Sequence, residues 1–221
     1  IAPKFSTSKF WNWVETYQPT WISIVPTIAA MLLKTEKPAF LKKSDLKFIR
    51  TASSPLPKII LQKFEEKFGL PLIETYGISE AAATIAANPL PPLAHKPGSV
   101  GLPLAVSFRF VEPYVKGHRM RSVDQGEIGE ICIKGPTVIS SYDKDAAPNS
   151  FSGGWFRTGD LGFQDSEGYI HITGRIKDII NRGGENISPR EIEEVLLAHP
   201  SIEDVAVVGQ PDPIYGEQVA A

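Results

Sequence analysis

The 221-residue sequence has a single cysteine and four histidines. One cysteine excludes a disulfide within the chain. Cys132 stands in the apolar alternation EICIKG, so we expect it to pack inside a strand. A lone packed cysteine fits a reducing compartment, and we expect a cytoplasmic protein, with a peroxisomal address left open. The histidines follow no metal-ligand spacing and are interpreted as surface or structural residues: His95, His118, His171 and His199.

The sequence also has no large excess of positive or negative charge and no long apolar run. The 23 lysines and arginines against 25 aspartates and glutamates leave a net charge of −2 without a basic block, so we expect no nucleic-acid partner. The most apolar run, residues 21–33, is interrupted by Ser23 and Pro26 and is too short to span a bilayer. The sequence starts in mid-pattern at Ile1, without an initiator methionine or a signal peptide, and we read it as an excerpt from a longer protein.

An alternation of strand and helix patterns fills the first part of the chain. Apolar or β-branched runs at 20–25, 46–52 and 72–75 predict three strands with helical segments between them. Short connections between such elements are typical of an α/β fold with a parallel sheet and flanking helices. Ligands of these sheets bind beyond the carboxyl ends of the strands, which here are the loops 52–55 (ASSP) and 76–80 (YGISE).

Two of the predicted helices have a clear apolar face. The first is expected to be capped by Ser8 and to turn Phe10, Val14 and Tyr17 inward. Its aromatic neighbours Trp11 and Trp13 are expected to widen this face. The other ends at Gly69. Its inward face is formed by Ile60, Leu61, Phe64 and Phe68.

Strand patterns alone follow the proline-rich segment 88–97, which we expect to cross between subdomains. They lie at 106–111 and 130–134 and on both sides of a hairpin turn at 165–168. Strands at this spacing without intervening helices indicate a small barrel or a distorted sheet. A further apolar strand is expected at 202–208.

The segment 174–194 joins a β-like half to a helix start. The first half ends at Gly183-Gly184, where the backbone is free of Cβ restrictions. In the second half Ser188 and Glu191 predict a capping box, with Pro189 at the first helical position. An ordinary glycine turn and a hinge with a working surface both fit these residues.

Three strings in this order, YGISE, WFRTGD and GRIKDIINRGGENISPREIE, resemble the adenylate-forming superfamily of acyl-CoA synthetases, adenylation domains and luciferases. The resemblance extends over nearly the whole chain. It implies part of a large α/β amino-terminal domain at 1–96 and a β-rich, barrel-like subdomain at 97–175. A hinge at 176–177 and an incomplete α+β carboxyl-terminal domain at 178–221 would follow.

The resemblance also implies which residues bind the nucleotide. The adenine ring would contact two short segments, Ala52-Ser53-Ser54 and Thr75-Tyr76-Gly77. The ribose hydroxyls would be bound by Asp160 and Arg175.

Catalytic positions are implied in the same way. Ser79, where the family more often has threonine, would contact the α-phosphate, and Glu80 would hold Mg²⁺, which prefers carboxylate and phosphate oxygens. Lys177 matches the hinge, and Gly184 matches the glycine beside the tunnel through which the thiol of coenzyme A arrives. Tyr142 follows Ser141 where the family commonly has glycine, and this pair is interpreted as a packing position.

The activity that the resemblance implies is that of an AMP-forming acyl-CoA synthetase. A carboxylic acid, fatty or aromatic, would react with ATP to give an acyl adenylate and pyrophosphate, and the acyl group would then pass to coenzyme A. The phosphate loop of the family would precede Ile1 and its catalytic lysine would follow Ala221, so the chain alone is expected to be inactive. The rest of the protein or a second copy is expected to cover its apolar strands.

Two alternatives stay open at this point. One is an amino-acid adenylation domain of a peptide synthetase, although the GGENISPREIE run favours an acyl-CoA ligase. The other is a non-catalytic nucleotide-binding fragment or a proteolytic remnant. A luciferase-like oxidase is less favoured than either.

Overall fold

The computed structural model describes residues 4–113, 120–145 and 147–221. The chain forms two compact units. The first contains the residues up to Gly77 together with Ala86–Gly101, and the second contains Ile78–Ile85 together with Leu102–Ala221. His118 of the sequence analysis lies outside the described residues.

The first unit is built on a parallel sheet, as predicted. Strands β1 (Trp21–Ile24), β2 (Phe48–Thr51) and β3 (Leu72–Ile78) pair in this order, all in the parallel sense. Strand β3 is longer than the sequence indicates, so Tyr76 and Gly77 belong to the strand and not to the loop after it.

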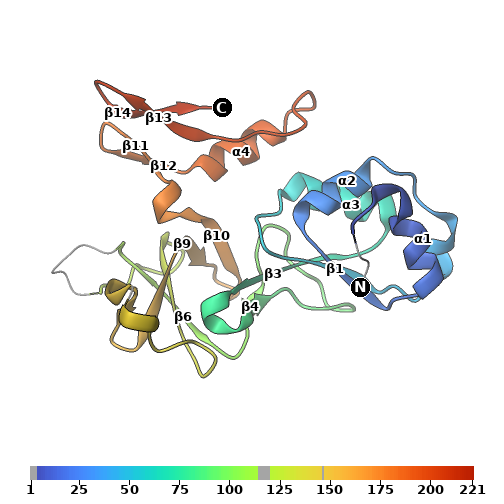
Figure 1. Cartoon of the computed structure of the whole chain (residues 1–221), viewed down its shortest axis with the longest axis horizontal. Helices are drawn as coiled ribbons and strands as arrows, with labels where there is room; N and C mark the ends of the chain where they lie inside the picture. Colours follow the sequence, from blue (N-terminus) through green and yellow to red (C-terminus); the bar gives the residue numbers. More distant parts are fainter. Residues whose placement is uncertain (1–3, 114–119, 146) are drawn as a thin grey trace. The chain divides into compact units, whose positions relative to one another are not determined.

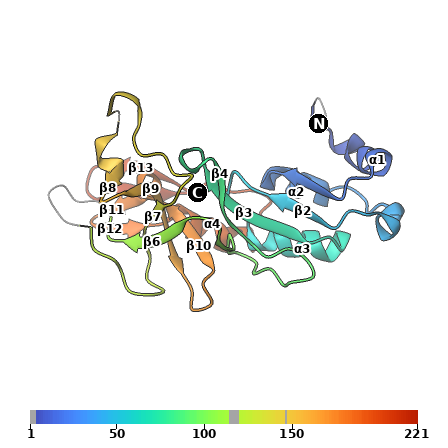
Figure 2. The ribbon, with the colours of Figure 1, turned by 90° about the horizontal axis from the view of Figure 1, so that it is seen from below.

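Helices cover one face of this sheet (Figure 1). They are α1 (Thr7–Tyr17), α2 (Pro26–Leu33) and α3 (Lys58–Phe68), with a 3-10 turn η1 (Ala39–Lys43) between α2 and β2. Figure 2 shows β2 and β3 running beside α2 and α3. The apolar core lies between sheet and helices, where Ile49, Leu72 and Phe64 are fully buried.

Helix α3 confirms the sequence reading, and α1 corrects it. Gly69 ends α3 in the left-handed conformation at φ +69°. Tyr17, which we expected to face inward, is 77% exposed, while Trp11 is buried next to the ring of Phe68 at 4.9 Å. Because Trp11 is part of the buried face of the helix, that face does not include the position of Tyr17 in the last turn. The residue that precedes the helix is Ser6 and not Ser8.

Strands β4 (Ala83–Ala87) and β5 (Leu102–Pro103) continue the first sheet in the order β1-β2-β3-β4-β5, and the turn η2 (Ser79–Ala81) precedes β4. The greater part of the second unit follows Gly101. Its main sheet is antiparallel and has the order β10-β9-β7-β6, from β6 (Ser107–Val111), β7 (Gly129–Lys134), β9 (Trp155–Gln164) and β10 (Ile170–Arg175). Strand β8 (Phe151–Ser152) pairs with β9, after the turns η3 (Asp143–Asp145) and η4 (Pro148–Ser150). These strands form the predicted barrel-like part of the fold.

The last part of the chain is a small α+β arrangement. After η5 (Ile176–Asp178) come β11 (Ile180–Arg182), β12 (Glu185–Ile187), α4 (Pro189–Leu197), β13 (Val208–Asp212) and β14 (Gly216–Ala220). The four strands form one sheet in the order β12-β11-β14-β13. Across the described residues, no helix has the length and apolarity needed to cross a membrane.

Two local predictions in this part are wrong. Ser188 precedes α4, but its hydroxyl donates to the carbonyl of Thr173 at 2.9 Å and makes no cap bond, so the capping box does not form. The strand expected at 202–208 starts only at Val208. The backbone N–H of Val207 instead donates to the carboxylate of Glu193 at 2.9 Å, and a donor used in this way is lost to a strand ladder.

Cys132 provides a test of the β-rich core. Its side chain is fully buried on β7, and burial raises the pKa of the thiol to about 12. A thiol titrates to the reactive thiolate only as the pH approaches its pKa, so at pH 8 the thiolate fraction is on the order of 10⁻⁴ in the folded protein. We expect a thiol-specific disulfide reagent at pH 8 to react only after denaturant is added. Fast reaction of the native protein would show that β7 is not packed as described.

Candidate functional site

Asp160 and Arg175, predicted to share a ligand, lie opposite each other on β9 and β10. The Nε of Arg175 is 2.8 Å from Oδ1 of Asp160. The Asp160 side chain is 4% exposed and that of Arg175 is 55% exposed, so the pair has one buried and one solvent-facing end. A carboxylate held in this way can accept further hydrogen bonds from hydroxyl groups.

The approach to Asp160 is shaped by irregular backbone. Gly159 has φ +75°, a conformation that glycine adopts without strain. The hydroxyl of Thr158 accepts the N–H of Asp160 at 3.1 Å and donates to the carbonyl of Ile131 at 2.8 Å. The register of β9 against β7 shifts at this point, and β-bulges of this kind re-aim side chains next to functional sites. Thr158 was not singled out from the sequence.

Glu80 is held at two points by one downstream segment. Its backbone carbonyl accepts the N–H of Ile139 at 2.8 Å, and its Oε1 accepts the phenol of Tyr142 at 2.8 Å. Burial, together with the bond to Glu80, raises the pKa of Tyr142 to about 12, so the phenol is a donor at neutral pH. The sequence interpretation of Tyr142 as a packing residue therefore missed a polar contact with a predicted site residue. Ser79, next to Glu80, is exposed.

The predicted adenine segments belong to the first unit. Ser53 has φ +81°, which is rare for a residue with a side chain, and both Ser53 and Ser54 are exposed. The Oγ1 of Thr75 accepts from the Nε of Arg50 at 3.0 Å and donates to the carbonyl of Thr51 at 3.2 Å. Tyr76 lies in β3 beyond Thr75.

Backbone strain gathers at both predicted loops. Ser53 lies in one of them, and Ala82 and Ala83, with φ of +56° and +113°, begin two positions after the end of the other at Glu80. Non-glycine residues in such conformations cost of order 1–3 kcal/mol each and cluster at functional sites. The observed strain supports the view that these loops are shaped for a ligand.

Lys177 and Gly184 lie in the small carboxyl-terminal part. Lys177 is exposed in η5, which links β10 to β11. Gly183 and Gly184 form the turn between β11 and β12 with φ of +61° and +95°. A Cβ on Gly184 would meet no atom within 4 Å, so within the described structure its conformation alone requires glycine.

Other titratable groups are paired for structural reasons. The Nε2 of His171 lies 2.9 Å from Oδ2 of Asp165 at the hairpin turn, and the Nε2 of His95 lies 2.9 Å from Oε1 of Glu65. The contact with Glu65 raises the pKa of His95, against the lowering effect of burial. In the part of the chain that the structure describes, no three histidine, cysteine, aspartate or glutamate residues are placed to hold a metal ion. Glu80 alone can still fit Mg²⁺, because this ion is commonly bound by one or two carboxylates plus substrate phosphates.

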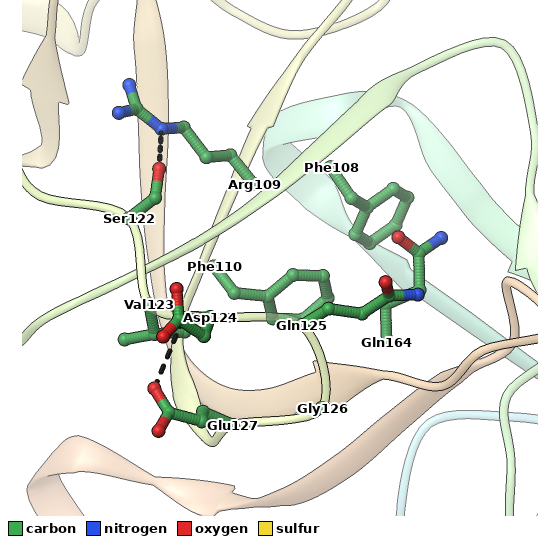
Figure 3. Close-up of a pocket in the computed structure, with 10 residues that line it drawn as sticks. All are labelled: Phe108, Arg109, Phe110, Ser122, Val123, Asp124, Gln125, Gly126, Glu127 and Gln164. Atoms are coloured by element: carbon green, nitrogen blue, oxygen red, sulfur yellow. Dashed lines mark hydrogen bonds between the residues drawn. The ribbon is translucent and has the colours of Figure 1, made fainter.

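An open hollow of about 400 Å³ lies on β6 and the turn that follows Ser122 (Figure 3). Its polar side chains bond to protein groups: the Nε of Arg109 donates to the hydroxyl of Ser122 at 2.8 Å, and Glu127 accepts the N–H of Asp124 at 3.1 Å. None of the predicted site residues lines this hollow.

Comparison with known proteins gives matches along most of the chain. The family model for the AMP-binding enzyme matches residues 1–143, and the model for the AMP-binding enzyme C-terminal domain matches residues 191–221. An oxalate–CoA ligase from Arabidopsis thaliana is 40% identical over 234 residues, which cover 99% of this chain and 42% of the relative. A sulfoacetate–CoA ligase from Cupriavidus necator is 42% identical, with 99% of this chain and 42% of the relative covered.

Solved structures agree with these matches. ATP-bound MatB from Rhodopseudomonas palustris has a TM-score of 0.87 at 33% identity, covering 99% of this chain and 43% of that one. The o-succinylbenzoate CoA synthetase MenE from Bacillus subtilis, in complex with an acyl-adenylate intermediate, has a TM-score of 0.79 at 34% identity, with 98% and 43% covered. The chain thus spans about two fifths of the length of these relatives.

The conformation of Ser53 can be tested by substitution. We expect Ser53→Val to destabilise the first unit by about 1–3 kcal/mol, because a β-branched residue is strained at positive φ. Ser53→Gly should be neutral or slightly stabilising. Denaturant unfolding followed by tryptophan fluorescence measures both changes. The matched control is Ser54→Val at the exposed neighbour without positive φ; an equal loss in both valine variants would contradict the strain at Ser53.

Proposed function

Because this chain belongs to the AMP-binding enzyme family, we propose that the protein carrying it is an AMP-forming acyl-CoA synthetase. The observation that carries the proposal is the Asp160–Arg175 pair at 2.8 Å, where two predicted ribose ligands meet from adjoining strands. The names of the curated relatives, such as oxalate–CoA ligase and sulfoacetate–CoA ligase, support a CoA ligase over an amino-acid adenylation domain.

The reaction has two steps: pyrophosphate is the leaving group of the first, and AMP is the leaving group of the second. A carboxylate oxygen of the acid attacks the α-phosphorus of ATP, a P–O bond forms, and the bond to pyrophosphate breaks. The thiol of coenzyme A, after losing its proton, then attacks the acyl carbon, and AMP leaves with the electrons of the C–O bond. A bare carboxylate is a poor acyl donor, so the first step is what makes the second one fast.

The residues of the second unit take distinct parts in this scheme. Asp160 accepts hydrogen bonds from the ribose hydroxyls, and Arg175 donates to the same sugar while it holds the Asp160 carboxylate in place. Ser79 donates to the α-phosphate. Glu80 provides a carboxylate oxygen for Mg²⁺, which neutralises phosphate charge when bound. Such residues accelerate phosphoryl chemistry mainly by stabilising charge in the transition state and by fixing the positions of the reacting groups.

The residues of the first unit bind the base. The segments Ala52-Ser53-Ser54 and Thr75-Tyr76-Gly77 supply small side chains, backbone groups and one aromatic face. This composition suits a flat ring that lies close to the backbone. Strain at Ser53 fits a loop whose shape serves a ligand.

We also propose that the small carboxyl-terminal part moves about residues 176–177. In this scheme 1–96 and 97–175 form the large domain and 178–221 the mobile one, with Lys177 at the pivot and Gly184 beside the path of the coenzyme A thiol. The exposed single turn η5 between β10 and β11 supports the position of the pivot. A charged pivot residue stays hydrated in both orientations. A buried lone cysteine fits the reducing compartments, cytoplasm or peroxisome, in which such an enzyme would work.

Removing the Asp160 charge tests the ribose contact. In the protein that carries this chain, we expect Asp160→Asn to raise the KM for ATP in pyrophosphate exchange roughly 10–100-fold, because Arg175 loses its partner and the sugar loses an anionic acceptor. The control is Asp124→Asn, which changes an exposed aspartate outside the predicted site. A wild-type KM for ATP in Asp160→Asn would contradict the role of this pair.

The class of substrate is tested by a panel of acids. We expect pyrophosphate exchange to depend on simple carboxylic acids, with oxalate, sulfoacetate, fatty and aromatic acids as the panel, and to be followed by acyl-CoA formation when coenzyme A is added. Amino acids and carrier proteins should give no stimulation. Exchange that responds to amino acids alone would support the adenylation-domain alternative, and AMP binding by calorimetry without any exchange would support a non-catalytic module.

A further inference from the structure

Glu80 and Tyr142 are 62 positions apart in the sequence and are joined directly in the structure. The contact belongs to a short segment, 139–142, that forms hydrogen bonds with both the backbone and the side chain of Glu80. Two hydrogen bonds of 2.8 Å from one segment fix the position of the residue and the direction of its carboxylate. A lone surface glutamate has no such restraint.

The tyrosine ring is itself fixed by aromatic neighbours. Its centroid lies 5.8 Å from Phe151 on β8 and 6.2 Å from Phe156 on β9, and these two rings are 5.2 Å apart. Edge-on and tilted contacts at these distances restrict ring rotation and add stability beyond buried area. The phenol oxygen is therefore presented to Glu80 from a rigid support.

The bond occupies only one oxygen of the carboxylate. Oε1 accepts the phenol, and among the described residues Oε2 accepts no hydrogen bond. Glu80 follows Ser79 and is half-buried, and the strained residues Ala82 and Ala83 begin two positions after it. One oxygen is thus tied to the protein, and the other is left for an outside partner.

We propose that Tyr142 is a positioning residue that orients the Glu80 carboxylate so that its free oxygen binds the divalent cation of the nucleotide complex. The inference rests on the proposed function, in which Glu80 is the carboxylate ligand of Mg²⁺. Tyr142 touches neither nucleotide nor metal in this scheme and acts through Glu80 alone. Partners that orient a metal ligand change metal affinity 10–100-fold when they are removed.

The test compares variants of the protein that carries this chain. Tyr142→Phe removes only the hydroxyl and keeps the ring packed against Phe151 and Phe156. Glu80→Gln removes the proposed ligand itself. Tyr17→Phe is the matched control, because it removes the same atom from a side chain that is 77% exposed.

Two measurements are made on each variant. ATP binding is followed by calorimetry over a range of Mg²⁺ concentrations, which requires no turnover, and pyrophosphate exchange is followed over the same range. We expect Tyr142→Phe to raise the Mg²⁺ concentration for half-maximal ATP binding roughly tenfold or more. Saturating Mg²⁺ should then restore the exchange rate, and the KM for the acid should stay within about twofold of wild type. Tyr17→Phe should match wild type throughout.

The outcomes separate the inference from the proposed function. If Glu80→Gln shifts the Mg²⁺ dependence and Tyr142→Phe does not, the positioning role is wrong while the ligand role of Glu80 stands, even when Tyr142→Phe lowers thermal stability. If Glu80→Gln leaves the Mg²⁺ dependence unchanged, the ligand role fails and the positioning role fails with it. Hydrogen exchange at the Ile139 amide shows whether the segment 139–142 still lies against Glu80 in Tyr142→Phe. If this amide loses its protection and the Mg²⁺ dependence of ATP binding stays unchanged, the result also contradicts the positioning role of Tyr142.

Discussion

Strand β9 depends on partners at both edges, and the β-rich part of the molecule depends on β9. It is hydrogen bonded to β7 on one side and to β10 on the other, and it carries two charged residues that are almost fully buried, Arg157 and Asp160. Buried charges are tolerated only with close partners. Arg157 pairs with Glu130 on β7, and Asp160 pairs with Arg175 on β10. A slip of one residue at either edge would turn these side chains to opposite faces, so the paired charges of β9 also fix the strand register.

Features with a local physical cause could be predicted from the sequence. The parallel sheet follows from alternating strand and helix patterns, and the end of α3 at Gly69 follows from the left-handed conformation that glycine accepts. The errors have distant causes. Trp11 sets the buried arc of α1 through its contact with Phe68, and Ser188 gives its hydroxyl to Thr173 in place of a local cap. The local sequence around Trp11 does not indicate its contact with Phe68, and the local sequence around Ser188 does not indicate its contact with Thr173.

Some residues of the candidate site could likewise be predicted from the sequence, and others could not. Motif resemblance was enough to expect Asp160 and Arg175 together, because the two strings that contain them are neighbours along the chain and form a hairpin. Tyr142 could not be found in this way. Its local sequence is an ordinary Ser-Tyr pair, and its hydrogen bond is made to a glutamate that only the fold brings near it. Packing and hydrogen bonding are also not exclusive: the ring of Tyr142 packs while its hydroxyl bonds.

The bulge in β10 shows how the small carboxyl-terminal part could be both anchored and mobile. The pairing of β10 with β9 shifts between Ile172 and Gly174, which leaves Thr173 outside the ladder. The carbonyls of Thr173 and Ile172 accept hydrogen bonds from Ser188 and Arg190 at the start of α4. Each such bond contributes about 0.5–3 kcal/mol net, the larger values applying to charged donors. Two such bonds stabilise one orientation of the small part by only a few kcal/mol. A ligand that prefers another orientation can offset this amount, and the population would then shift about the pivot that we propose at η5.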